Sequence, residues 1–234
     1  MIPLRDDIST QRFPLVTTVL IAINVAVFVA QPFLLPRWGL SLQSWYYLVG
    51  ARPFELSHHI DVPPFSAFPW WATLFSSLFV HGGWLHLIFN MLYLWIFGNN
   101  VEDVMTRPRF VAFYFLCGMA ATTAQVLVAP DSGVPLVGAS GAIAGVLGAY
   151  LVLFPRARVL TVVPLLVVFP VFDVPAWVML LIWFGLQALS GVQSFGSGQT
   201  GIAFFAHIGG FVAGMGLALL LARRRPRRRA RRRV

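Results

Sequence analysis

The chain is organised as six long hydrophobic stretches separated by short polar connections. A helix that crosses a lipid bilayer needs about 20 mostly apolar residues. Stretches of about that length lie at residues 14–31, 73–98, 110–129, 137–154, 175–190 and 201–222. The pattern therefore predicts an all-α membrane protein, a bundle of six transmembrane helices.

The fifth stretch is ambiguous, because residues 159–190 are almost all apolar but contain Pro164, Pro170, Asp173 and Pro175. They form either one span with an apolar lead-in or two spans. Arginine usually stays on the cytoplasmic side of a membrane. Six spans with a cytoplasmic N-terminus place 15 of the 17 arginines inside, whereas seven spans place only 6 inside. We therefore expect six spans, both termini in the cytoplasm, and a short interfacial or half-inserted segment at 159–172.

This topology divides the chain into three parts. Residues 1–13 are a cytoplasmic lead, 14–222 form the six-span domain, and 223–234 are an arginine-rich cytoplasmic tail. Within the domain a long outer loop covers 32–72, where SLQSWYYLVGARPFEL predicts an amphipathic helix on the membrane surface. The first span is too long for the apolar region of a cleaved signal peptide, so we expect it to remain.

Composition agrees with a membrane protein. The chain is 58% hydrophobic and 11% charged, whereas soluble domains carry about 25% charged residues. The net charge of +9 comes from the tail, which directly follows a span; this favours an anchor at the inner leaflet over a nucleic-acid site. A single cysteine, Cys117, excludes an internal disulfide. The absence of an internal repeat disfavours a transporter.

Three places within the spans carry polar groups, which are rare there and usually functional. In HGGWLHLIFN, His86 and Asn90 are four residues apart and share one helix face. His81 is turned away by about 140° on an ideal helix, so we expect it to brace the loop. The other two places are Ser140 in GASG and His207 in AHIGGFVAG. Each of these, taken alone, also fits simple helix packing.

Topology brings these groups together. The starts of the second, fourth and sixth spans lie on the outer side, so His86, Asn90, Ser140 and His207 are expected at a similar depth. A serine nucleophile needs a base, and a developing oxyanion needs hydrogen-bond donors. The set supplies all three functions. No acid is placed to orient the histidine, which predicts a Ser–His dyad instead of a triad.

The three motifs resemble those of the rhomboid family of intramembrane serine proteases. HGGWLHLIFN fits the family pattern H-x4-H-x3-N, GASG fits GxSG, and AHIGGFVAG fits AHxxGxxxG, in the same order and on the same spans. The resemblance covers about residues 10–222. It implies that Ser140 is the nucleophile, that His207 is the general base and later the acid, and that His86 and Asn90 stabilise the oxyanion.

The resemblance also implies supporting roles. Gly148, Gly210 and Gly214 would bring the fourth and sixth spans together. His81, Gly138 and Gly141 would be structural residues near the site. An inner-face hydrogen-bond cluster would consist of Asn99, Glu102 and Asp103.

The sequence departs from the family pattern at two places. Ala72 or Thr73 stands where some members carry an arginine that anchors the outer loop, and Ala144 stands where some carry a tyrosine against the histidine, so another group must hold His207.

The fifth span supplies bulky residues, and we expect Trp177 and Phe184 to act as a side gate, with the loop GVQSFGSGQTG as a lid.

The substrates that the resemblance implies are single-span membrane proteins with a small residue at the cleaved bond and an easily unwound helix. No metal, cofactor or nucleic acid is implied, and the sequence predicts no oligomeric state. The compact form favours a bacterial plasma membrane. The alternative function is a non-catalytic, rhomboid-like protein that binds membrane clients.

Overall fold

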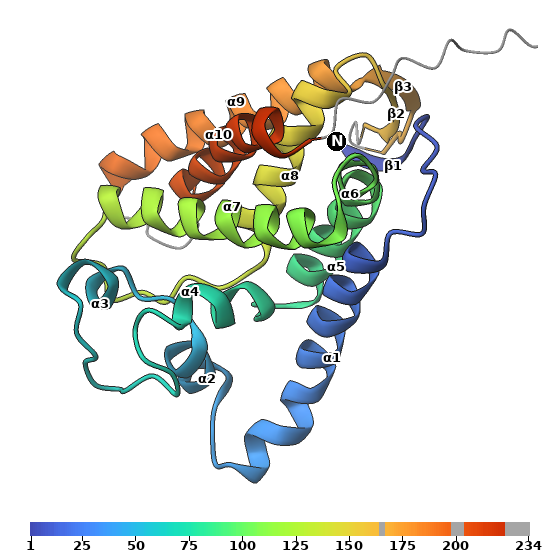
Figure 1. Ribbon diagram of the computed structural model, residues 1–234. Coiled ribbons are helices and arrows are strands. Elements are labelled where there is room, and N and C mark those ends of the chain that lie inside the picture. Colours follow the sequence, from blue (N-terminus) through green and yellow to red (C-terminus); the bar gives the residue numbers. More distant parts are fainter. Residues whose placement is uncertain (164–166, 198–203, 223–234) are drawn as a thin grey trace, which may run out of the picture.

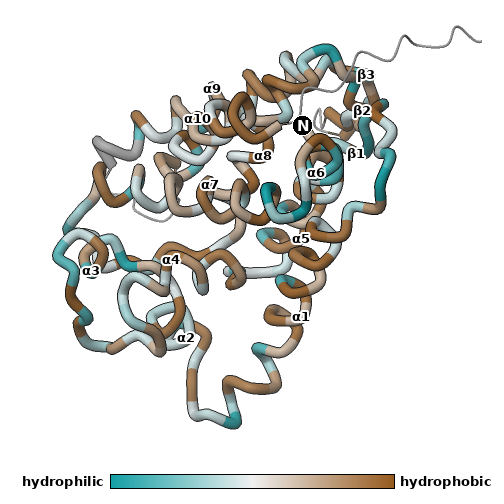
Figure 2. Tube along the Cα trace, in the orientation of Figure 1, coloured by the Kyte–Doolittle hydropathy of each residue, from teal (hydrophilic) through white to brown (hydrophobic). Residues whose placement is uncertain are grey.

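The computed structural model describes residues 1–163, 167–197 and 204–222. The protein is mostly helical, and four of its helices are long and apolar enough to cross a membrane. These four are α1 (Leu15–Arg37), α7 (Arg107–Val128), α9 (Ala176–Ser197) and α10 (Phe204–Leu221). Hydrophobic residues run along these helices, and hydrophilic residues lie mainly in the connections (Figure 2). The structure thus confirms a helical membrane protein.

The predicted second span is broken in two. Helix α4 (Thr73–Ser76) and the short 3-10 helix η1 (Ser77–Phe79) come first, and a second helical segment runs from Trp84 to Val104 at 98° to them. This second segment contains α5 (Trp84–Tyr93), a π-helical turn η2 (Leu94–Gly98) and α6 (Asn99–Val104). Two successive glycines, Gly82 and Gly83, precede it and disfavour a continuous helix. Only if this bent pair is one span does the number of candidate spans reach five.

The break changes the position of His81. The residue lies between the two helical segments instead of on a helix, so the expected 140° rotation away from His86 is wrong. The two imidazole rings contact each other edge to face, with centroids 5.0 Å apart. His81 is fully buried, and neither ring nitrogen has a hydrogen-bond partner among the described residues.

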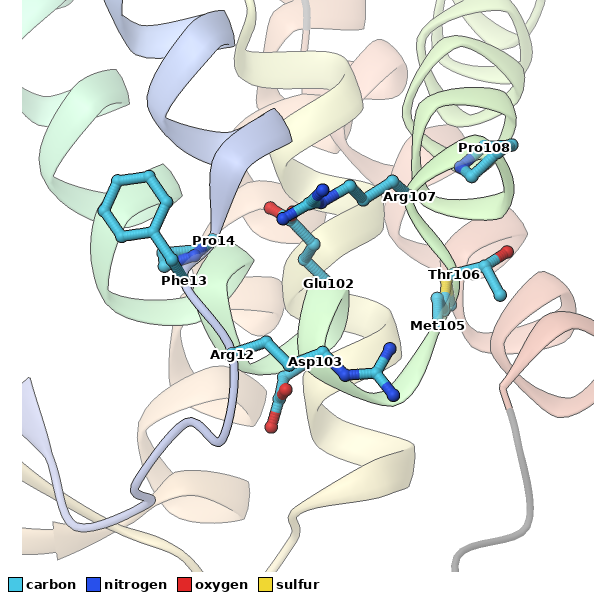
Figure 3. A pocket seen from close by; sticks show the side chains of 9 residues that line it. All are labelled: Arg12, Phe13, Pro14, Glu102, Asp103, Met105, Thr106, Arg107 and Pro108. Atoms are coloured by element: carbon cyan, nitrogen blue, oxygen red, sulfur yellow. The ribbon is translucent and has the colours of Figure 1, made fainter.

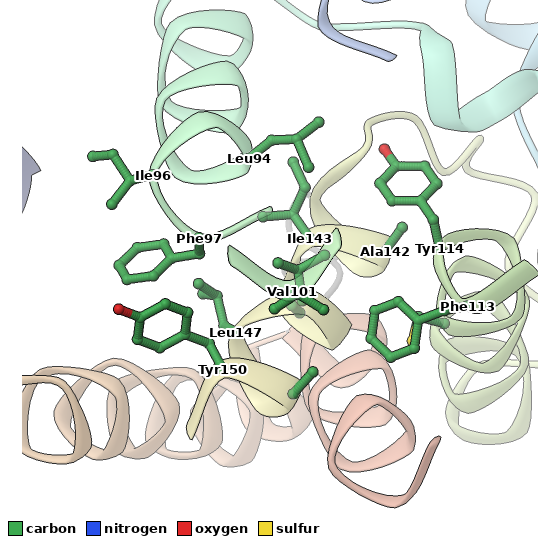
Figure 4. Close-up of a cluster of buried hydrophobic side chains, with 14 of the residues drawn as sticks. Leu94, Ile96, Phe97, Val101, Phe113, Tyr114, Ala142, Ile143, Leu147 and Tyr150 are labelled. Carbon is green, nitrogen blue, oxygen red and sulfur yellow. The ribbon is translucent and has the colours of Figure 1, made fainter. Parts of the chain in front are cut away.

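Helix α8 (Ser140–Leu153) forms the centre of the bundle. Every residue from Gly141 to Tyr150 is buried. It packs against α7 and α10, and a cluster of buried side chains from α5 to α8 surrounds it, including Phe97, Val101, Phe113 and Leu147 (Figure 4). The helix has only 14 residues, fewer than a lone span needs, but protein covers most of its length.

A small antiparallel sheet joins the N-terminus to the connection between α8 and α9 (Figure 1). Its strands, in the order β1-β2-β3, are Ile2–Asp6, Arg158–Val162 and Val171–Pro175. Where the structure describes the segment expected to be interfacial or half-inserted, its β-branched residues pair as strands. The position of these strands relative to the membrane stays a prediction. Residues 164–166 lie outside the described part of the chain.

The outer loop contains two short helices, α2 (Leu42–Val49) and α3 (Pro53–His58), where the sequence predicted one. Gly50, Ala51 and Arg52 separate them, and Ala51 pairs with Leu136 as an isolated β-bridge. The buried Arg52 guanidinium forms an ion pair with Glu55 and donates to the carbonyl oxygens of Val62 and Pro64, each at 2.8 Å. These contacts all lie within the outer loop, so they hold its own turns together.

Of the predicted cluster of Asn99, Glu102 and Asp103, the two carboxylates bind the segment that leads into α1, whereas Asn99 Oδ1 has no hydrogen-bond partner among the described residues. Glu102 accepts hydrogen bonds from the backbone N–H groups of Val16 and Thr17, at 3.0 and 2.8 Å, and from the Thr17 hydroxyl. Asp103 accepts one from the Gln11 N–H group at 3.0 Å. Carboxylates are favourable beside the free N–H groups of a helix N-terminus. A cavity of about 360 Å³ adjoins both carboxylates, and the side chains of Arg12 and Arg107 lie beside it (Figure 3). The cluster joins the N-terminal lead to α6.

Strand β1 is also tied to the bundle by Asp6, whose carboxylate accepts from the Tyr150 hydroxyl at 2.6 Å and from Asn100 Nδ2 at 2.5 Å. Burial raises the pKa of Asp6 above its ordinary value of 3.8, although the Tyr150 hydrogen bond opposes this. The folded state therefore holds the proton more strongly than the unfolded state. We expect the contribution of Asp6 to stability to be largest below pH 3.8 and to fall as pH rises through the raised folded pKa.

Thermal unfolding of the parent and of Asp6→Asn in detergent, measured at several pH values, tests this prediction. The amide does not titrate, so the parent is expected to lose stability relative to the variant as pH rises from 3.8. A difference between the two proteins that stays constant with pH contradicts it.

Candidate active site

The start of α8 meets the start of α10. Ser140 is the first residue of α8, and His207 is the fourth residue of α10. Ser140 Oγ lies 2.8 Å from His207 Nε2, within hydrogen-bond distance. The two residues are 67 positions apart in the sequence, so only the packing of these two helices brings them together.

Glycines make this packing possible. A Cβ atom at Gly210 would lie 2.1 Å from the backbone oxygen of Gly141, and one at Gly214 would lie 1.9 Å from that of Gly145. A Cβ atom at Gly148 would lie 2.0 Å from the backbone oxygen of Phe211. Real Cβ atoms do not approach that closely, so any side chain at these positions would push α8 and α10 apart.

A cavity of about 230 Å³ opens beside the Ser140–His207 pair. Helix α5 contributes Phe89, Asn90 and Tyr93 to its wall, and α9 contributes Trp183 and Gln187. The remaining wall consists of apolar residues of α8, namely Ile143, Ala144 and Leu147. The site is thus a mainly apolar space between α5, α8, α9 and α10 in which the polar groups face one another.

His86 approaches the same region from α5. Its Nδ1 atom accepts a hydrogen bond from the Gly82 N–H group at 3.3 Å, which leaves Nε2 as the protonated nitrogen. Gly138 has a φ of +123°, and a Cβ atom there would lie 2.8 Å from His86 Nε2 and 3.7 Å from Ser140 Oγ. The Nε2–H donor therefore lies beside the turn that carries the serine.

Asn90 is the second donor from α5. It lies one helical turn after His86, is buried, and lines the cavity together with Ser140. Its Nδ2 group has no hydrogen-bond partner among the described residues. A buried amide donor without a partner costs free energy unless a bound group accepts from it. The first N–H groups of α8, which carry partial positive charge, add to the donors near Ser140.

Helix α9 supplies two contacts to His207 that the sequence analysis missed. Gln187 Oε1 lies 2.8 Å from His207 Nδ1. The Trp183 ring lies beside the imidazole, with centroids 6.0 Å apart. Gln187 and Trp183 thus contact His207 in a protein that has alanine at position 144, where a tyrosine ring would otherwise lie against the histidine. One signal was present in the sequence, because Gln187 is a polar residue inside an otherwise apolar span.

The residues predicted as a gate lie elsewhere. Trp177 is in the first turn of α9, and Phe184 packs against Phe211 of α10, with ring centroids 4.8 Å apart. Neither lines the cavity, whereas Trp183 does. Of the predicted lid, residues 198–201 lie outside the described part of the chain, as does the arginine-rich tail.

The arrangement is chemically suited to a hydroxyl nucleophile. Among the described residues, no group of three His, Cys, Asp or Glu side chains gathers in the manner of a metal site. An imidazole at hydrogen-bond distance from a hydroxyl can accept its proton, and hydrogen-bond donors beside the hydroxyl can stabilise a negatively charged oxygen.

Comparison with known proteins agrees with the motifs. Residues 69–224 match the model of the Rhomboid domain. The mitochondrial Rhomboid protein 1 of Saccharomyces cerevisiae is 32% identical over 147 residues, which are 61% of this chain and 40% of that protein. The Rhomboid protease GluP of Bacillus subtilis is 40% identical over 82 residues, which are 35% of this chain and 15% of that protein.

A chloroplast relative, Rhomboid-like protein 11 of Arabidopsis thaliana, is 30% identical over 126 residues, which are 54% of this chain and 38% of that protein. The matched segments thus cover less than half of each of these relatives. Because the relatives come from mitochondria, a chloroplast and a bacterium, they do not favour one membrane over another, and the expected bacterial plasma membrane stays a prediction.

Proposed function

The chain belongs to the rhomboid family, and on that premise we propose that it is an intramembrane serine endopeptidase that hydrolyses peptide bonds of other membrane proteins. The single observation that carries this proposal is the distance of 2.8 Å between Ser140 Oγ and His207 Nε2. The side chains are already at the separation that proton transfer from a hydroxyl to an imidazole requires.

In the proposed reaction, His207 Nε2 accepts the hydroxyl proton while Ser140 Oγ attacks the carbonyl carbon of the scissile bond. The resulting tetrahedral intermediate carries its negative charge on the former carbonyl oxygen. His207 then donates the proton to the leaving amine, which leaves an acyl ester on Ser140. A water molecule, activated by the same imidazole, hydrolyses the ester and restores the serine.

The donors around Ser140 fit the negatively charged oxygen. His86 contributes Nε2–H, Asn90 contributes the unpartnered Nδ2–H, and the backbone N–H of Ser140 is among the free donors at the start of α8. Preorganised donors of this kind act strongly in a site from which bulk water is excluded. Their role explains why polar groups are placed within an apolar helix.

For the topology we propose six spans, with the segment from Trp84 to Val104 as the second and α8 as the fourth. Both termini are then cytoplasmic, and the start of α8 lies near the outer surface. This arrangement agrees with the 15 arginines expected inside. At that depth the cavity beside Ser140 can exchange water with the outside, and hydrolysis needs water. The domain then spans residues 14–222, between the lead and the tail.

We further propose that substrates enter between α5 and α9. Both helices contribute side chains to the cavity, and Phe89 of α5 is 40% exposed. Trp183, which lines the cavity, is a better candidate for the side gate than Trp177 or Phe184. The proposed substrates are single-span proteins whose helix unwinds easily, because the amides of an intact helix are bonded internally.

The experiment that tests this function uses the purified full chain, reconstituted in lipid with a panel of single-span model proteins that carry small residues near the outer end of the span. We expect cleavage at one bond in this region, identified by mass spectrometry of both products. Stable binding of the panel without cleavage would overturn the protease proposal and favour the client-binding alternative.

The oxyanion assignment gives a separate prediction. Asn90→Ala and His86→Ala are each expected to lower kcat by about 10²- to 10³-fold, the loss typical for one oxyanion donor. The KM should change little, because these donors act mainly in the transition state. Cleavage kinetics of the reconstituted variants measure both constants. Gln125→Ala, which removes a half-buried amide on α7 outside the cavity, is the control and is expected to keep the parental kcat.

A loss confined to KM, with kcat unchanged in both variants, would contradict the oxyanion role. It would show that His86 and Asn90 bind the substrate equally in the ground state and the transition state.

A further inference from the structure

We propose that Gln187 is a positioning residue that orients His207 and sets which of its nitrogens carries the proton. This inference rests on the proposed function of the Ser140–His207 pair and extends it to a third residue on α9. Gln187 Oε1 lies 2.8 Å from His207 Nδ1, and Ser140 Oγ lies 2.8 Å from Nε2. The imidazole is therefore held at both nitrogens in one line of hydrogen bonds.

The direction of these bonds decides their effect. A neutral imidazole carries one proton, and its other nitrogen is an acceptor. Because the amide oxygen of Gln187 can only accept, Nδ1 must be the protonated nitrogen. Nε2 then has a free lone pair directed at the Ser140 hydroxyl, as a general base requires. An acid has the same effect in a catalytic triad, but a neutral amide adds no charge in this apolar position.

Helix α9 is built to hold the amide at that place. Its first residue follows strand β3, and backbone N–H groups of Ala176 and Trp177 donate to the carbonyl oxygens of Ala157 and Pro155, at 2.8 and 3.3 Å. The inner end of α9 is thus fixed to the sheet. Trp183 and Gln187 are four residues apart and share one face, so both reach His207 from one helix.

Helix α8 offers the imidazole no second support at position 144. The fourth residue after the serine is Ala144, whose side chain is too short to carry a ring or a hydrogen bond. Among the described residues, Gln187 and Ser140 are the hydrogen-bond partners found for the His207 ring. A glutamine within a membrane span is costly unless its amide is bonded, which this contact provides.

Kinetics of three variants in lipid test the inference. Gln187→Leu keeps the volume but removes the acceptor, and we expect kcat to fall by about 10- to 100-fold, as for outer partners of metal-bound histidines, with KM unchanged. Gln187→Glu keeps the acceptor and adds charge, and we expect kcat near the parental value at alkaline pH. Its carboxylate stabilises the protonated imidazole, so the acidic limb of the pH–rate profile should move to higher pH. Gln125→Leu makes the same change on α7, outside the cavity, and should leave kcat and the pH profile unchanged.

A purely structural role would not shift the pH profile. If Gln187→Leu and Gln187→Glu both cleave with the kcat and pH profile of Gln125→Leu, the positioning role is overturned while the protease function stands. If Gln187→Leu does not fold, the isosteric Gln187→Glu decides by its pH profile.

A second measurement does not depend on proteolysis. Nitrogen NMR of ¹⁵N-histidine-labelled protein should show His207 protonated at Nδ1 in the parent and a mixture of tautomers in Gln187→Leu. If the parent cleaves no substrate, the proposed function fails, and this spectrum still tests Gln187. The same tautomer ratio in parent and variant would overturn the inference.

Discussion

Ser140→Ala and His207→Ala should each lower the rate of substrate cleavage by about 10⁴-fold or more, because the nucleophile and its base act as one unit. Alanine at position 140 removes the hydroxyl oxygen that we propose as the attacking atom. Alanine at position 207 removes the acceptor that lies 2.8 Å from the Ser140 hydroxyl. The measurement is single-turnover cleavage of a single-span substrate in lipid. The double variant should be no slower than either single variant, since their effects are not additive.

Two matched substitutions serve as controls for this prediction. Ser190→Ala replaces a serine of α9 that does not line the cavity, and His58→Ala replaces an exposed histidine of the outer loop. Both are expected to cleave at the parental rate. If Ser140→Ala retains more than a small fraction of the parental activity while the controls are unaffected, another residue is the nucleophile.

Gly214→Val should destabilise the protein by about 3 kcal/mol, the upper end of the usual cost of overpacking, and should also abolish cleavage. A Cβ atom at Gly214 would lie 1.9 Å from the backbone oxygen of Gly145, so the added side chain must push α10 away from α8. These two helices carry His207 and Ser140. Even the fraction that stays folded would therefore lose the 2.8 Å contact between them.

The same helix offers a control. A Cβ atom at Gly216 has no atom within 4 Å, so Gly216→Ala should keep the parental stability and activity, or gain up to about 1 kcal/mol from helix propensity. Thermal unfolding in detergent and cleavage in lipid measure the two quantities. Equal unfolding temperatures for Gly214→Val and Gly216→Ala would contradict the close helix contact.

Sequence periodicity predicted the helices well because each span is a local pattern of apolar residues. It placed α7 and α10 close to their observed bounds. The polar residues were equally informative. Ser140, His207, His86 and Asn90 stand out in an apolar setting, and topology alone predicted that they lie at one depth. The structure brings Ser140 and His207 into contact, while their roles remain proposals.

Long-range pairing was beyond local patterns. The apolar residues of β2 and β3 resemble a membrane segment, and β1, which pairs with β2, lies more than 150 residues away from it in the chain. Helix geometry also misled at His81, because the prediction assumed a helix where Gly82 and Gly83 separate two. Gln187 is visible as a polar residue within span five, but it is 20 positions from His207, and only the packing of α9 against α10 brings the two side chains together.

Activation of the Ser140 nucleophile by His207 is the central step of the proposed function. The most direct measurement is mass spectrometry of the folded protein after reaction with a fluorophosphonate, which phosphonylates an activated serine with loss of fluoride. We predict one adduct, on Ser140, in the parent, and none in His207→Ala under the same conditions. An adduct on another serine, or equal labelling of Ser140 with and without His207, would contradict the account.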